Sequence, residues 1–164
     1  MGSSRRVSMG KLEALWLEYG ARDVRTYLQS GNVLFEHPVS DASKLASGIE
    51  AMLGRSLAFD VSVILRTRDD LQRIVNGDPF RGRDESKMHV TFLKSRPHDK
   101  PLDELAVAAP GGDEFRIGGL EVYLFCPNGY GRTKLSNAFF EKKLKVEATT
   151  RNWNTVRSLL SRAR

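Results

Sequence analysis

A repeated order of predicted elements constrains the fold of this chain more than any other feature. In the second half, period-2 alternation of apolar residues predicts strands and 3.6-residue periodicity predicts helices. Their order is β-α-β-β-α-β plus a terminal helix, over residues 88–93, 102–108, 114–117, 120–125, 135–144, 146–149 and 151–163. This is the split βαβ order of ferredoxin-like domains.

The first half repeats this order without its first strand. It predicts a helix over 9–19, a hairpin of strands 23–28 and 32–36, a helix over 41–53, a strand over 59–65 and a helix over 68–75. We therefore expect an α+β fold of two ferredoxin-like (split βαβ) units in tandem with a C-terminal helix. The units would span residues 1–78 and 87–164 and pack as one globular unit.

The absent first strand would lie in the middle of its sheet, between the last strand and the third. Unpaired backbone groups at that position would be costly. Three explanations stay open: the native protein begins upstream of Met1, another chain supplies the strand in a homo-oligomer, or the half refolds around the gap.

Composition bears on the cellular compartment. No apolar run approaches the roughly 20 residues of a membrane helix, and the opening MGSSRRVSMG lacks the apolar core of a secretory signal. A single cysteine, Cys126, excludes an intramolecular disulfide. We therefore expect a cytoplasmic protein without a membrane partner.

Four segments resemble a known family. VRTYLQSGNVLF at 24–35, VTFL at 90–93, GYGRTKL at 129–135 and ATTRNWNTV at 148–156 are similar to the bacterial family of domain of unknown function 1697. The resemblance covers nearly the whole chain in order. Family members usually begin with a strand resembling ALLRGINVGG, so the resemblance implies a native start upstream of Met1. The resemblance implies a fold, but it implies no biochemical activity.

Positive charge is concentrated at the C-terminal end. The net charge is +6, yet residues 130–164 hold nine Lys or Arg against Glu141 and Glu147, and the first 129 residues are nearly neutral. An acidic or phosphate-bearing partner would therefore bind there. The alternative is a basic helix that is merely solvated.

The main candidate site is a basic, glycine-containing loop that leads into a predicted helix. Its candidate ligand-binding residues are Gly129, Gly131, Arg132, Thr133 and Lys134. Glycines let backbone N–H groups approach an anion, and a helix N-terminus favours negative charge. The GxxxxGK[ST] spacing of a Walker A motif is absent. A simple turn with solvated charges is the alternative.

The second candidate is the start of the last helix, with Arg151, Asn152 and Asn154 predicted in its first turn. A cation there opposes the helix dipole unless an anion lies nearby, although capping by the preceding threonines explains part of the pattern. The last two strands of a split βαβ sheet end at the same side. We therefore predict one anion site that joins Arg132, Lys134 and Arg151.

Other residues carry weaker predictions. Gln29, Ser30 and Asn32 at the hairpin tip are secondary candidates for ligand contacts, although Ser-Gly-Asn is first of all a turn sequence. The three histidines lack metal-ligand spacing, and no catalytic pair can be assigned. We expect no metal site and no cofactor.

The functional prediction is binding of a phosphate-bearing ligand, either a nucleotide or a nucleic acid, at the basic end. The alternatives are a small-molecule enzyme with an anionic substrate and an assembly domain that uses strand addition. Phe92, Tyr123 and Phe125 could stack nucleic-acid bases on an open sheet. We expect them to be buried instead, because the last helix needs a surface to cover.

Overall fold

The computed structural model describes residues 7–27, 31–97 and 110–164 and has a mixed α+β fold with two antiparallel sheets. The chain forms two compact units, Met1–Leu65 (unit 1) and Arg66–Arg162 (unit 2). The boundary therefore lies earlier than the sequence order implied, and the helix predicted at 68–75 belongs to unit 2. Within the described part of the chain, no helix is long and apolar enough to cross a membrane.

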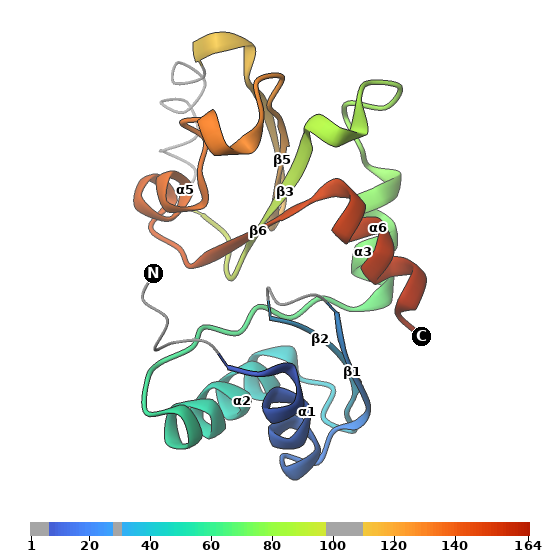
Figure 1. Ribbon diagram of the computed structural model, residues 1–164, viewed down its shortest axis with the longest axis vertical. Coiled ribbons are helices and arrows are strands. Elements are labelled where there is room, and N and C mark those ends of the chain that lie inside the picture. The colour runs from blue at the N-terminus through green and yellow to red at the C-terminus, as the bar shows by residue number, and fades with distance from the viewer. Residues whose placement is uncertain (1–6, 28–30, 98–109) are drawn as a thin grey trace. The chain divides into compact units, whose positions relative to one another are not determined.

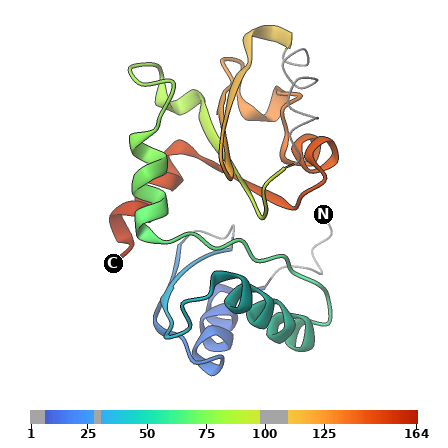
Figure 2. The same ribbon diagram turned by 180° about the vertical axis from the view of Figure 1, so that it is seen from behind.

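Unit 1 consists of two helices and a hairpin (Figures 1 and 2). The elements are α1 (Met9–Glu18), β1 (Arg22–Tyr27), β2 (Asn32–Glu36) and α2 (Ala42–Leu57), and the two strands pair antiparallel. Ser8 and Asp41 begin the helices as N-caps, because their side chains accept hydrogen bonds from Lys11 N and Lys44 N. These elements lie close to their predicted positions, apart from the end of α2.

The core of unit 1 comes from the apolar stripes of both helices and from the sheet. Its buried members are Leu12, Leu15, Trp16, Ala21, Val24, Leu45, Ile49, Met52, Leu53 and Val63. Helix α2 continues through Gly54, where the sequence predicted its end. It stops instead at Ala58, which adopts a left-handed conformation (φ 58°), and the added turn lets Leu57 pack against the core.

The predicted strand 59–65 is not formed, which corrects the sequence analysis. In the described structure these residues belong to no helix or strand. In the split βαβ order this strand would pair only with the first strand of its unit, and no described residue forms that strand. Val63 is buried in the core, and its backbone N–H donates to Glu50 Oε1 (2.8 Å) instead of to a neighbouring strand.

Unit 2 contains a four-stranded antiparallel sheet in the order β4-β5-β3-β6. The elements are α3 (Arg68–Asn76), β3 (Met88–Leu93), β4 (Glu114–Gly118), β5 (Glu121–Phe125), α5 (Asn137–Leu144), β6 (Ala148–Asn152) and α6 (Trp153–Arg162). The first strand, β3, lies between the third and the last, as the split βαβ order requires. The helix predicted over 102–108 lies outside the described residues.

Helices cover both faces of this sheet: α5 lies on one side, and α3 and α6 lie on the other (Figure 1). On the α5 face, Leu93, Val122 and Leu124 pack with Phe140 and Leu144. On the opposite face, the hydroxyl of Tyr123 donates to Ile74 O of α3 (2.8 Å). Period-2 alternation thus assigns each strand residue to one of two covered faces.

The last strand and helix differ from the prediction by several residues. The strand was predicted over 146–149 and the helix from 151 onward, whereas β6 runs to Asn152 and α6 begins at Trp153. Arg151 and Asn152 therefore belong to a strand. Pairing with β3 explains the difference, because His89 and Val90 are aligned with Asn152 and Arg151 in the ladder.

Candidate functional site

Strands β5 and β6 end at the same side of the unit 2 sheet. Phe125, at the end of β5, is aligned with Met88 at the start of β3, and Asn152, at the end of β6, is aligned with His89. Both candidate segments therefore leave the sheet at one end.

The loop after β5 is held by its own hydrogen bonds. Gly129 has φ +88°, a conformation that favours glycine, and its N–H donates to Cys126 O (2.9 Å). The Thr133 hydroxyl donates to Asp113 Oδ2 (2.6 Å) and accepts from Leu135 N (3.0 Å). Gly129 and Thr133 thus have structural roles that account for their presence.

Tyr130 connects this loop to the α5 face of the sheet. Its ring stacks on His89, with 4.6 Å between ring centroids, and its hydroxyl accepts from Asn137 N at the start of α5 (2.8 Å). Burial lowers the pKa of His89 below its ordinary value, against the opposing effect of a hydrogen bond with the Lys87 backbone. His89 is therefore neutral at pH 7.

Beyond Tyr130 the loop is open to solvent. Gly131 is exposed, and a Cβ added there would meet no other atom within 4 Å. Arg132 and Lys134 are exposed as well. The structure therefore keeps these two predicted cations on the surface, close in sequence to the N-terminus of α5.

Three further exposed lysines follow on α5 and just after it. Together with the loop cations they form a group that we call the basic row: Arg132, Lys134, Lys142, Lys143 and Lys145. In the described part of the chain, none of the five forms an ion pair. Glu141 is the one carboxylate in this stretch, and its Oε1 accepts from Ala148 N (2.9 Å).

Arg151 is not part of this surface, because it lies on the other face of β6. Its ladder partner Val90 is also aligned with Tyr123, which contacts α3. The Arg151 guanidinium donates to Thr149 Oγ1 (2.6 Å) and Thr150 O (3.0 Å). The structure therefore does not bring Arg151 together with the basic loop, although both lie at the same end of the sheet.

The position of Arg151 also removes the helix-dipole argument from the sequence analysis, since the residue precedes α6. Burial lowers the pKa of Arg151, but a guanidinium stays protonated at physiological pH. Asn152 caps α6, because its Oδ1 accepts from Thr155 N (2.8 Å). Asn154 is exposed in the first turn of α6.

The hairpin-tip candidates lie in unit 1. Gln29 and Ser30 are outside the described residues. Asn32 is 9% exposed, and its Nδ2 donates to Tyr27 O (3.0 Å) across the turn. The structure thus supports a turn role for Asn32.

The three aromatic residues that the sequence offered for base stacking are buried, as expected. Phe92, Tyr123 and Phe125 are 5%, 7% and 7% exposed, so a base could not stack on them without displacing other side chains, such as Phe80 and Arg83 against Phe125. Cys126 is fully buried, and burial raises the pKa of its thiol. In the described part of the chain, no group of three His, Cys, Asp or Glu side chains could hold a metal ion.

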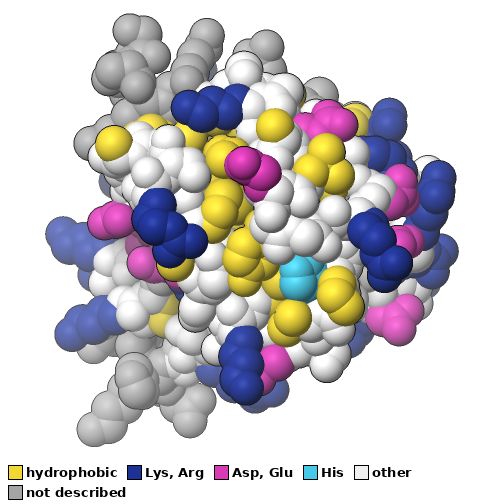
Figure 3. All heavy atoms as spheres, turned by 90° about the horizontal axis from the view of Figure 1, so that it is seen from below, with side chains coloured by type: hydrophobic (Ala, Val, Ile, Leu, Met, Phe, Trp, Pro, Cys, Tyr) yellow, Lys and Arg dark blue, Asp and Glu magenta, His cyan; other side chains and the backbone are white. Residues whose placement is uncertain are grey.

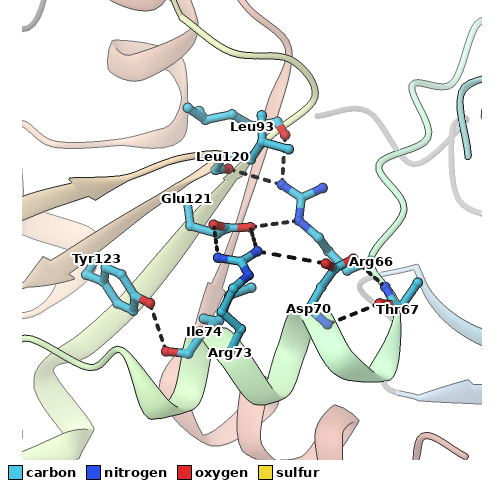
Figure 4. A network of polar contacts seen from close by, with 9 residues as sticks. All are labelled: Arg66, Thr67, Asp70, Arg73, Ile74, Leu93, Leu120, Glu121 and Tyr123. Carbon is cyan, nitrogen blue, oxygen red and sulfur yellow. Dashed lines mark hydrogen bonds and ion pairs between the residues drawn. The ribbon is translucent and has the colours of Figure 1, made fainter.

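A buried ion network on the α3 side was missed by the sequence reasoning (Figure 4). Glu121, at the start of β5, is fully buried. Its Oε1 accepts from Arg66 Nε (3.0 Å), and Arg73 of α3 approaches both carboxylate oxygens at 3.4 Å. Glu121 is the one charged residue within the otherwise apolar stretch 120–126, and that interruption was the available signal in the sequence.

Arg66 closes the network against the ends of two strands. Its Nη2 donates to Leu93 O (2.8 Å) and Leu120 O (3.1 Å), and its guanidinium lies 5.5 Å from the centre of the Phe92 ring. Hydrogen bonds within unit 2 thus satisfy the buried charge. We assign the network to stability.

Comparisons with known proteins agree on the fold. The family model described as "Protein of unknown function (DUF1697)" matches residues 1–123. The solved structure of a conserved bacterial protein, SP0830 from Streptococcus pneumoniae, is similar with a TM-score of 0.78 at 19% identity, over 98% of this chain and 91% of that chain. No curated protein matches the sequence.

Proposed function

We propose that this chain, which belongs to the family of proteins of unknown function DUF1697, binds a phosphate-bearing ligand through the basic row. The proposal is argued from the surface chemistry of the chain itself. The observation that carries the proposal is the set of five exposed cations, within residues 132–145, that lack ion pairs with any described residue.

Some other exposed basic residues of unit 2 are paired with carboxylates, although Arg68, Arg81 and Arg96, like the basic row, form no ion pair in the described part of the chain. Arg83 and Arg157 are also exposed, but they form ion pairs with Glu114 and Glu85. Within residues 132–145 the five cations face a single carboxylate, Glu141, so like charges in this stretch repel one another at low ionic strength. A bound phosphate group would relieve that repulsion and form charge-assisted hydrogen bonds.

The loop end of the row has a further electrostatic feature. Arg132 and Lys134 precede α5, whose N-terminus carries partial positive charge, whereas Lys142 and Lys143 lie in its last turn, where cations stabilise the helix. The two loop cations therefore have no such stabilising role. This supports a ligand role for them in particular.

Binding tests the proposal directly. We expect inorganic tripolyphosphate, ATP or a 20-nucleotide DNA strand to bind the full chain, as measured by thermal shift and fluorescence anisotropy. The Arg132→Gln/Lys134→Gln variant should bind about tenfold more weakly, a loss of about 1.4 kcal/mol.

The matched control is Lys11→Gln/Lys44→Gln, which removes the same charge from two exposed lysines of unit 1. It should bind like the wild type. Equal weakening by both variants would show a response to net charge alone, and absence of binding by every phosphate compound would refute the proposal.

We also propose that both units are ferredoxin-like and that the protein is cytoplasmic. The strand order of unit 2, with its first strand between the third and the last, supports the fold. The order of α1, β1, β2 and α2 supports the same type of fold for unit 1. The single buried thiol of Cys126 suits a reducing compartment.

A further inference from the structure

We infer that the ligand of the basic row is a nucleic acid, contacted along its sugar–phosphate backbone without reading of the bases. The inference rests on the proposed function and names its ligand class. Three observations carry it: the length of the row, the burial of the sheet aromatics, and the absence of exposed large apolar side chains from the described residues of unit 2.

The first observation is length. Helix α5 has eight residues, so its axis is about 12 Å long, and the row extends beyond both of its ends. Each strand of a DNA duplex carries one negative charge per about 3.4 Å of axis. A nucleic acid strand can therefore place phosphates near Arg132 at one end and Lys142 at the other, whereas a mononucleotide presents its phosphates as one compact group.

The second observation concerns the bases. In unit 2, the aromatic side chains that a ferredoxin-like sheet could offer for stacking, Phe92, Tyr123 and Phe125, are all 7% exposed or less. Tyr130, in the loop, is stacked on His89. The accessible chemistry of the row is therefore cationic, and phosphate contacts carry no sequence information.

The third observation disfavours an anionic membrane surface. Membrane-surface segments combine cations with apolar side chains that insert into the bilayer. Among the described residues, the exposed large apolar side chains are Leu17 and Val39, and both belong to unit 1. The row has none. In Figure 3, by contrast with the basic row, basic, acidic and hydrophobic side chains are interspersed on the face shown.

Salt dependence of binding tests the inference. We expect 20-nucleotide DNA and RNA strands of mixed, all-T and all-A sequence to bind with affinities within about threefold, because the bases are not read. If all five cations contact phosphates, the slope of log K against log[salt] should be about −3.5 for single strands. ATP and inorganic tripolyphosphate should bind more weakly than the strands.

Two double variants probe the two ends of the row. Arg132→Gln/Lys134→Gln and Lys142→Gln/Lys143→Gln should each reduce the magnitude of the slope by about 1.4, and Lys142→Arg/Lys143→Arg should retain it. The Lys11→Gln/Lys44→Gln control should leave the slope unchanged. Thermal unfolding of each variant separates loss of binding from loss of folding.

The outcomes distinguish this inference from the proposed function. If ATP binds as tightly as the strands and only the loop variant weakens it, the inference is wrong and the proposed function stands. If no phosphate compound binds, both are wrong. Preferential binding to phosphatidylserine vesicles, or a large difference between all-T and all-A strands, would also overturn the inference.

Discussion

Glu121 is the only fully buried charged side chain among the described residues, and its partners differ in exposure. The Arg66 side chain is 10% exposed and that of Arg73 is 56% exposed. Water screens the second pair and hardly reaches the first. The Arg66 pair therefore dominates the energy of this network, because removal of one partner leaves a buried charge without compensation.

We predict that Glu121→Gln destabilises unit 2 by about 3 kcal/mol, since the guanidinium of Arg66 loses its counter-charge. Urea unfolding measures the change. The control is Glu114→Gln, which removes the exposed ion pair with Arg83 and should cost at most about 1 kcal/mol. Similar losses in both variants would show that burial does not set the strength of the Glu121 network.

His89 gives a prediction for pH. Burial lowers its folded-state pKa below the ordinary 6.5, so below pH 6.5 the unfolded state binds more protons than the folded state. Stability must then fall as the pH falls through 6.5 toward the folded-state value. His89→Phe keeps a ring against Tyr130 and should remove this part of the dependence.

The measurement is the melting temperature of wild type and variant between pH 7.5 and 5.5. The wild type should lose more stability on acidification than His89→Phe. His37→Gln, a change in unit 1, should leave the acid loss of unit 2 intact. Parallel curves for the wild type and His89→Phe would contradict the assignment.

At the scale of elements, the contact between α1 and α2 depends on a glycine. A Cβ added at Gly48 of α2 would overlap the hydroxyl of Tyr19, whereas one added at Gly10 of α1 would meet no atom within 4 Å. The Tyr19 ring in turn stacks on His37, with 5.4 Å between ring centroids. Displacement of Tyr19 would therefore disturb a second contact.

We predict that Gly48→Ala destabilises unit 1 by about 1–2 kcal/mol, because overpacking exceeds the gain in helix propensity. Gly10→Ala, which meets no atom, should instead be neutral or stabilising by up to about 1 kcal/mol. Thermal unfolding of both variants compares them. Stabilisation by Gly48→Ala would mean that Tyr19 moves aside at no cost.

At the scale of the whole molecule, each unit has its own core and its own tryptophan. Trp16 is buried in unit 1 and Trp153 in unit 2, at 6% and 2% exposure. The chain has no other tryptophan. Fluorescence of single-tryptophan variants can therefore follow each unit separately in the full chain.

We predict that the two units respond separately to substitution. In a Trp16→Phe background, which leaves Trp153 as the probe, Glu121→Gln should lower the urea midpoint. In a Trp153→Phe background the same substitution should leave the midpoint unchanged. Equal shifts seen by both probes would mean that the chain unfolds as one cooperative unit.

The sequence by itself determined most elements, because local patterns specify them. Ser8 and Asp41 mark helix starts, apolar periodicity marks the helix faces, and alternation marks β3 and β5. The order of these elements was sufficient to predict the mixed α+β fold class. It also placed the ends of β5 and β6 at one side of the sheet, since that follows from strand direction alone.

Tertiary structure decided what depends on partners distant in the chain. Pairing with β3 placed Arg151 in a strand and on the face opposite the α5 side. Residues 59–65 are not a strand despite their alternation, because a strand also needs a neighbour to pair with. Glu121 found its counter-charge 55 residues away in Arg66, a distance at which local periodicity carries no information.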